Sequence, residues 1–148
     1  MKSLFVITLW LFAFSHSTLA QDTSRAQNKD TARTQDSLLE RVTFSKVEVE
    51  AQYPGGNNAW LHFLVKHLRY PEAAVSNNIQ GTVWIQFIVD RQGNVSDVQA
   101  FDGPDQGGLR EEAVRLITTS GKWTPGTQNG RQVRSYKKMP IGFKLSRG

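Results

Sequence analysis

The alternation of apolar and polar residues predicts four strands after residue 41. In the most regular stretch, residues 80–90, four apolar side chains fall on one face: Val83, Ile85, Phe87 and Val89. A period of two residues is typical of a strand that buries one face. Further strands are predicted at 42–50, 95–101 and 133–145. Because the residues at 90–94 are of turn-forming types, the strands at 80–90 and 95–101 are predicted to form a hairpin.

A helical period of apolar residues predicts the first of two helices. This helix ends near Arg69, and one of its stripes carries Trp60, Leu61, Leu64 and Leu68. Its N-terminal cap is predicted at Asn57 or Asn58, whose side chains can accept hydrogen bonds from the first free N–H groups. The residue before Pro71 avoids helical geometry, which ends the helix. Pro71 can then start a short further turn.

The second helix is predicted at residues 109–120, where one stripe carries Leu109, Ala113, Leu116 and Ile117. Residues 127–131 are predicted to form a loop. Three large aromatic side chains are predicted to anchor the core: Trp60, Trp84 and Trp123. Runs of strands with two packed helices indicate an α+β fold rather than a wound parallel sheet.

The first 41 residues differ from the rest in composition. Residues 1–20 contain one lysine, an apolar stretch of eleven residues and a small-residue site ending at Ala20, which together are typical of a cleaved signal peptide. A short retained membrane anchor is the alternative, and either one predicts export from the cytoplasm. Residues 21–41 are almost wholly polar and predict a flexible linker. Residues 42–148 are numerous enough to form an independent domain.

Composition argues against several kinds of catalytic or metal site. The chain has no cysteine, which excludes disulfides and thiolate chemistry. His62 and His67 are five residues apart on the predicted helix and do not converge on a metal. Four aspartates lie in or near predicted turns, where their side chains favour local hydrogen bonds: Asp90, Asp97, Asp102 and Asp105. Since no nucleophile elbow or phosphate loop is present either, we expect neither an enzyme nor a bound cofactor.

The charge of the chain is positive and unevenly distributed. The net charge is +5, and residues 113–148 contain eight basic residues and no acidic one. Such a basic segment favours an acidic peptide, lipid headgroups or nucleic acid through long-range attraction, and the alternative is a solvated surface without a partner. Nucleic acid is one such partner, because Trp123, Tyr136 and Phe143 could stack on bases, but the predicted export argues against it.

Pro140 lies inside the last predicted strand. Because proline has no N–H to donate, this strand is predicted to lie at a sheet edge, with the proline nitrogen facing outward. An edge strand offers unpaired backbone groups and can accept a strand from another chain. The alternative is that this edge binds nothing, and that the proline and the nearby lysines only protect it from unwanted pairing: Lys137, Lys138 and Lys144. The edge is therefore either a binding strand or a protected one.

Short motifs in a fixed order carry a family resemblance. They are Tyr53-Pro54-Gly55-Gly56, Tyr70-Pro71, Gly93-Asn94-Val95, Lys122-Trp123-Thr124-Pro125-Gly126 and Pro140-Ile141. With their spacing, residues 53–145 resemble the C-terminal domain of the TonB energy-transducer family, in the form common in Bacteroidetes. The resemblance implies two helices packed on a small antiparallel sheet. It also implies a periplasmic protein that binds the box peptides of TonB-dependent outer-membrane receptors and transmits force from inner-membrane motor proteins.

The resemblance implies a peptide site beside the last strand. Its residues would be Lys138, Met139, Pro140, Ile141, Gly142 and Phe143, with His67, Arg69, Tyr70 and Pro71 alongside. The chain departs from a full-length transducer in its short apolar segment and its proline-free linker. A soluble envelope adaptor without energy transduction is therefore the alternative function. An open edge would also permit a homodimer.

Overall fold

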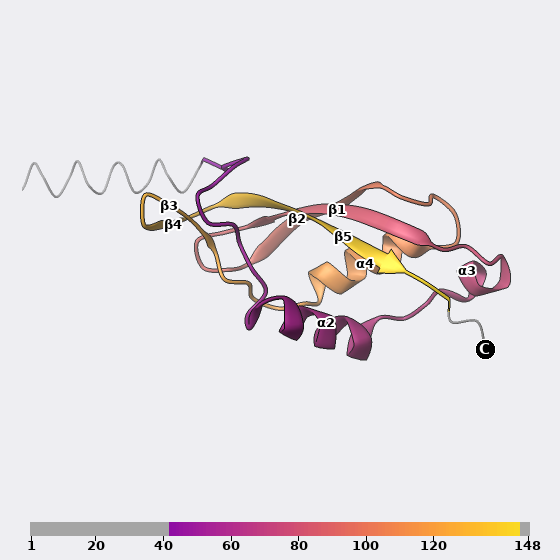
Figure 1. Ribbon diagram of the computed structural model, residues 1–148. Helices are drawn as coiled ribbons and strands as arrows, with labels where there is room; N and C mark the ends of the chain where they lie inside the picture. The colour runs from indigo at the N-terminus through magenta and orange to yellow at the C-terminus, as the bar shows by residue number, and fades with distance from the viewer. Residues whose placement is uncertain (1–41, 146–148) are drawn as a thin grey trace, which may run out of the picture. The chain divides into compact units, whose positions relative to one another are not determined.

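Antiparallel pairing of three strands organises residues 42–145, the part of the chain that the computed structural model describes (Figure 1). The strands are β1 (Gly81–Val89), β2 (Val95–Asp102) and β5 (Ser135–Phe143), in the spatial order β2-β1-β5. β1 pairs with β2 across the predicted hairpin turn and with β5 in one unbroken register. The predicted signal peptide at 1–20 and the linker at 21–41 lie outside the described residues.

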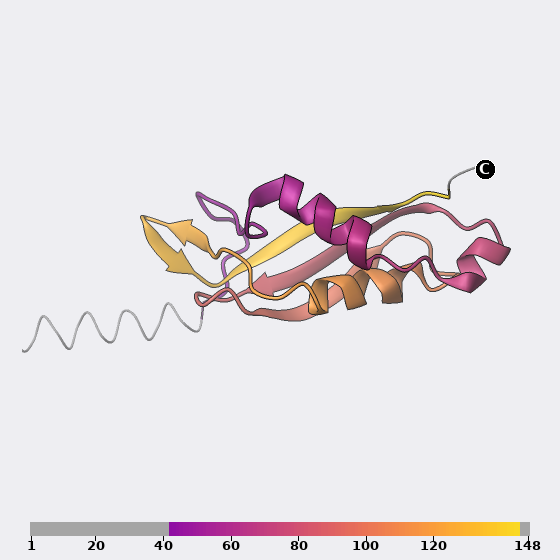
Figure 2. The same ribbon diagram turned by 90° about the horizontal axis from the view of Figure 1, so that it is seen from below.

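Within residues 42–145, three helices accompany the sheet: α2 (Gly56–His67), α3 (Glu72–Ser76) and α4 (Leu109–Thr118). Figure 2 shows α2 and α4 on the same face of the sheet, with α2 running beside β5. The predicted α+β class is therefore confirmed, and α3 is the short turn expected after Pro71. The predicted cap at Asn57 or Asn58 is wrong. Gly55 caps α2 with a φ of 85°, a conformation that glycine adopts without steric cost.

The core lies between the sheet and the helices. The predicted apolar faces of β1 and α4 are buried, and Ile141 and Phe143 of β5 join them. Trp123 is 4% exposed and contacts the rings of Phe87, Trp60 and Tyr53, with centroid distances of 4.9, 5.5 and 5.6 Å. Its indole N–H donates to the Ser120 hydroxyl at 2.9 Å, so the polar atom of this ring is satisfied.

Three further sequence predictions are wrong. Residues 42–50 do not form a strand, because this segment makes only single-residue bridges, from Phe44 to β5 and from Val49 to the strand β3 (Gly126–Gln128). The predicted loop at 127–131 is a hairpin of β3 with β4 (Arg131–Val133). Its Asn-Gly turn has positive φ at both residues, which matches the twist of a tight hairpin.

Trp84 is the third error, since it is 41% exposed rather than part of the core. It alternates with the buried residues of β1 and therefore points to the opposite face of the sheet from Val83 and Ile85. The helices cover the face that carries Val83 and Ile85, and they leave the face of Trp84 open (Figure 2). A large aromatic residue on a strand is thus buried only if its face is the covered one.

Candidate functional site

The free edge of β5 is the main candidate for a binding site. β5 lies at one edge of the three-stranded sheet, as Pro140 predicted. At the start of this edge the Phe44 N–H donates to the Arg134 carbonyl, and the Tyr136 N–H donates to the Phe44 carbonyl, both at 2.9 Å. Tyr136 therefore directs its backbone groups outward, away from β1.

The outward direction recurs at every second residue along a strand, so Lys138, Pro140 and Gly142 also face outward. Within residues 42–145 no other segment makes a backbone hydrogen bond to these three residues on this side. Lys138 and Gly142 offer an N–H and a C=O each, and Pro140 offers a C=O alone. A partner strand thus finds two donors and three acceptors in a row.

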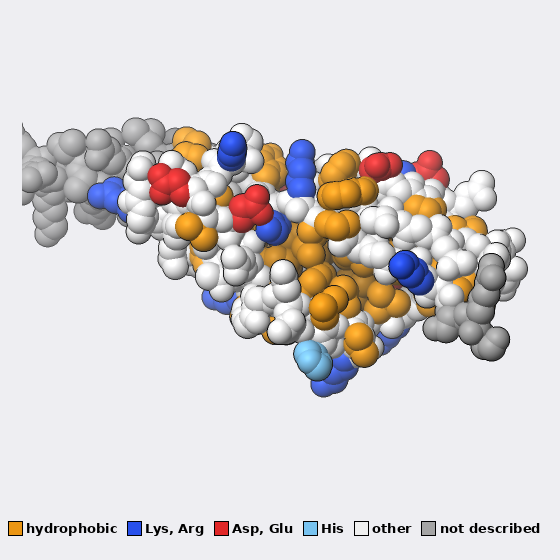
Figure 3. All heavy atoms as spheres, in the orientation of Figure 1, with side chains coloured by type: hydrophobic (Ala, Val, Ile, Leu, Met, Phe, Trp, Pro, Cys, Tyr) orange, Lys and Arg blue, Asp and Glu red, His pale blue; other side chains and the backbone are white. Residues whose placement is uncertain are grey.

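A groove of about 500 Å³ runs between this edge and α2. Its β5 wall carries Lys137, Lys138, Met139, Pro140 and Gly142, and Trp123 also contributes to the lining. The opposite wall comes from α2 and the segment before it: Ala51, Gln52, Tyr53, Asn57, Trp60, Leu61 and Leu64. Figure 3 shows apolar side chains gathered in this hollow between α2 and β5.

The two lysines at this edge differ in their surroundings. Lys137 is 17% exposed and pairs with the Glu50 carboxylate at 2.6 Å. Lys138 is exposed on the other face of the sheet, where its ammonium lies 5.5 Å from the centre of the Phe101 ring. One lysine is therefore neutralised beside the groove, and the other is available to a carboxylate on the outer face.

The predicted site residues are brought together only in part. Lys138, Met139, Pro140 and Gly142 line the groove, whereas Ile141 and Phe143 are buried in the core. Tyr70 packs its ring edge against Phe143 at 5.9 Å and donates its hydroxyl to the Ile79 carbonyl at 2.8 Å. Burial raises the pKa of this hydroxyl above its ordinary value.

Like Tyr70, the remaining predicted residues His67, Arg69 and Pro71 do not line the groove. His67 stacks on Phe63 at 4.4 Å, Arg69 donates its backbone N–H to Glu112, and Pro71 precedes α3. The wall opposite β5 is formed instead by residues of the segment 51–64, of which the sequence predicted only Trp60 as a core anchor. The stripe of Trp60, Leu61 and Leu64 was visible in the sequence, but the exposure of Leu61 depends on what packs against α2.

An ion pair within α4 holds the end of α2 through hydrogen bonds to its backbone. Glu112 is buried and accepts hydrogen bonds at 2.7 Å from the Arg69 backbone N–H and from the Arg115 guanidinium. Arg115 also donates to the His67 carbonyl at 2.7 Å. Burial opposes ionisation of Glu112, but these hydrogen bonds and positive charges outweigh it and hold its pKa below the ordinary value. The pair positions the connection from α2 to Tyr70.

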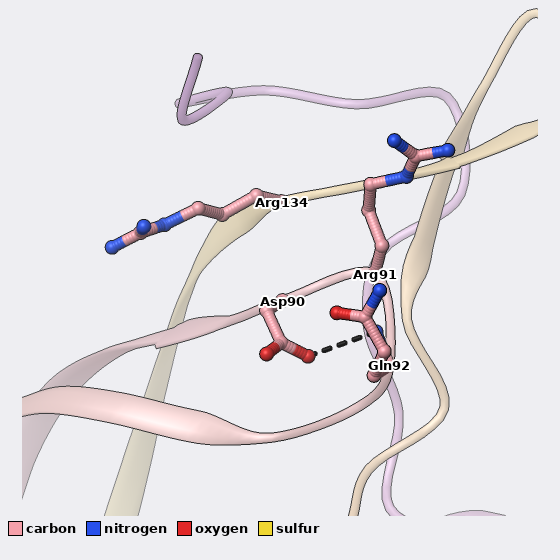
Figure 4. Close-up of a pocket in the computed structure, with 4 residues that line it drawn as sticks. All are labelled: Asp90, Arg91, Gln92 and Arg134. Carbon is pink, nitrogen blue, oxygen red and sulfur yellow. Dashed lines mark hydrogen bonds between the residues drawn. The ribbon is translucent and has the colours of Figure 1, made fainter. Parts of the chain in front are cut away.

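A second hollow, of about 210 Å³, lies at the β1–β2 turn and is lined by Asp90, Arg91, Gln92 and Arg134. The Asp90 carboxylate accepts from the backbone N–H groups of Gln92 and Asn94, both at 2.8 Å. Burial opposes ionisation here too, but the hydrogen bonds keep the pKa of Asp90 below its ordinary value. Figure 4 shows both arginine side chains pointing away from this carboxylate. Asp90 therefore serves the turn, as the sequence predicted.

Residues 42–145 contain no group of three His, Asp or Glu side chains that could hold a metal, and no helix among them is long and apolar enough to cross a membrane. An open edge strand beside an apolar groove is typical of domains that bind an extended segment of another protein.

The family model for the Gram-negative bacterial TonB protein C-terminal domain matches residues 66–145, more than half of the chain. The chain belongs to this family, and the predicted resemblance is confirmed. No curated protein matches the chain. The family takes part in energy-coupled transport at the outer membrane and interacts in general with TonB-dependent receptors. Its domain faces the periplasm, and it is a transport and interaction family rather than an enzyme family.

Proposed function

We propose that this chain is a periplasmic TonB-like protein that binds the box peptides of outer-membrane receptors by strand addition to β5, in support of energy-coupled transport. The observation that carries the proposal is the row of outward backbone groups at Lys138, Pro140 and Gly142 beside the groove. Main-chain hydrogen bonds supply affinity in this mode of recognition, and adjacent pockets supply specificity. Force transmission from inner-membrane motor proteins belongs to the same proposal.

Strand addition is expected to perturb the backbone of β5 and little else. We expect the amide signals of residues 137–144 to shift when a receptor box peptide is titrated into the isotopically labelled protein. Sedimentation without peptide is the control, because a second copy pairing with β5 would perturb the same amides. Shifts confined to the turn at 90–95 would contradict the proposal.

Substitution of Gly142 by proline tests the backbone bonds directly. Proline removes an outward N–H that makes no bond to β1, and the position of a Cβ on Gly142 is free of neighbours within 4 Å. We expect Gly142→Pro to weaken peptide binding about 2- to 12-fold, which corresponds to the usual net value of one hydrogen bond, about 0.5–1.5 kcal/mol. Isothermal titration calorimetry with the same peptide measures the change.

Gly142→Ala is the matched control, because alanine adds a Cβ and keeps the N–H. Its affinity should stay within about twofold of the wild-type value. Circular dichroism of both variants checks that the sheet is intact. Equal peptide affinity of the proline variant and the wild type would exclude β5 addition at Gly142.

The adaptor function, without energy transduction, differs from the proposal in what the N-terminal segment does. Intact-mass measurement on the chain recovered from membrane and soluble envelope fractions separates the two. A soluble product that starts at Gln21 would favour the adaptor, and a full-length chain in the membrane fraction would favour the transducer.

A further inference from the structure

We infer that the wall formed by residues 51–64 selects the side chains of the strand that adds to β5, with Leu61 as the specificity-determining contact. This inference rests on the proposed function, since it concerns the occupant of the same edge. The family match covers residues 66–145, so this wall lies before the matched region. The family match by itself therefore assigns no role to this wall.

The sheet geometry determines which side chains of an added strand reach the wall. Side chains alternate between the two faces of a sheet, so half of them lie on the face of Met139, toward α2. Those side chains enter the groove between β5 and α2. The others lie on the outer face, with Lys138.

The wall has an apolar surface that the described residues leave uncovered. Trp60 is buried and Leu64 half-buried, but Leu61 is 56% exposed although it lies at the groove. The groove volume of about 500 Å³ is typical of sites that enclose a ligand. Its one charged side chain on the helix face, Lys137, is already paired with Glu50. The wall therefore favours bulky apolar side chains over polar ones.

The face of the sheet away from α2 favours a negative charge on the bound peptide. Lys138 is exposed at the edge, and the segment 113–148 carries eight basic residues and no acidic one. Residues directly opposite each other on neighbouring strands point to the same face. The occupant is therefore an extended peptide with two bulky apolar residues at positions i and i+2, and with a carboxylate at a position that faces Lys138.

Two peptides and two variants test the role of the wall. The first probe is a short end-blocked peptide with one glutamate, threonines, and leucines at i and i+2, and the second has alanine in place of both leucines. The variants are Leu61→Ser and, as the matched control, Val65→Ser. Val65 is 86% exposed and lies one turn from Leu61, with which it lines a neighbouring hollow, but it does not line the groove. Its substitution therefore removes exposed apolar surface beside Leu61 without changing the groove.

For the wild type and Val65→Ser we expect the leucine peptide to bind about tenfold or more tightly than the alanine peptide, from the apolar area that two leucines bury. In Leu61→Ser this ratio of affinities should fall to about threefold or less. The leucines of the peptide gain affinity through contact with the Leu61 side chain, so the two changes are not additive. Calorimetry measures the affinities, and amide shifts at 137–144 report edge binding.

The outcomes separate the two proposals. An unchanged ratio in Leu61→Ser, with amide shifts still at 137–144, would overturn the role of the wall and leave strand addition standing. Binding of neither peptide, or shifts away from β5, would overturn strand addition itself. An equal fall of the ratio in Val65→Ser would also overturn the assignment to Leu61, since that residue lies outside the groove.

Discussion

Replacing Trp123 by alanine is expected to lower the free energy of unfolding by about 3–5 kcal/mol, the usual cost of truncating a buried tryptophan. The ring is almost fully buried and contacts Phe87 of the sheet as well as Trp60 of α2. Its backbone N–H also donates to the Gly93 carbonyl at 2.8 Å, which ties it to the β1–β2 turn. Because Trp123 also lines the groove, its loss should loosen the wall as well as the core.

Urea denaturation followed by circular dichroism measures this loss. Trp84→Ala is the control, because it deletes the same side chain from the exposed face of the sheet and should cost about 1 kcal/mol or less. Equal losses in the two variants, or a loss below about 0.5 kcal/mol for Trp123→Ala, would contradict the buried position of Trp123.

Replacing Glu112 by alanine is expected to cost about 2–3 kcal/mol, since it leaves the Arg69 N–H and the Arg115 guanidinium without their carboxylate. The loss should be smaller than for a fully buried pair, because Arg115 is about one-third exposed and water can replace part of its lost partner. Glu111→Ala is the control, because Glu111 is adjacent and exposed. A Glu112→Ala variant as stable as Glu111→Ala would show that the ion pair contributes nothing.

The lowered pKa of Glu112 makes this contribution dependent on pH. A carboxyl with a folded-state pKa below its unfolded value stabilises the protein fully above the unfolded value, and this stabilisation is lost as the pH falls through the folded value. The stability advantage of the wild type over Glu112→Gln should therefore be constant at neutral pH. It should shrink once the pH drops below the ordinary value of 4.5. An advantage that grows with acidity would contradict the lowered pKa.

Sequence periodicity predicted well those parts of the fold that depend on local pattern. The β1–β2 hairpin follows from two alternating segments around turn residues, and α4 follows from its apolar stripe. The Asn129-Gly130 turn was also readable, because Asn-Gly is a strong signal for a tight hairpin, but the strands beside it are only three residues each. Strands of that length carry too few alternations to be recognised.

The candidate site was predicted for the edge strand but not for its opposite wall. Pro140 marked β5 as an edge from its chemistry alone, since a proline nitrogen cannot join a ladder. The partner segment 67–71, by contrast, came from the family resemblance. The structure places His67 on Phe63 and Arg69 on Glu112, and sets Leu61 across the groove instead. A local sequence pattern cannot predict the exposure of Leu61, because that exposure depends on how a strand distant in the sequence packs against α2.

The sequence by itself determined the α+β class, the edge position of β5 and the outward direction of its proline. These follow from residue types and their spacing, which act over a few neighbours along the chain. Only the tertiary structure decided that Trp84 is exposed while Trp60 and Trp123 are buried, and that α2 and β5 enclose a groove. The physical reason is that burial depends on which surfaces far apart in the sequence meet.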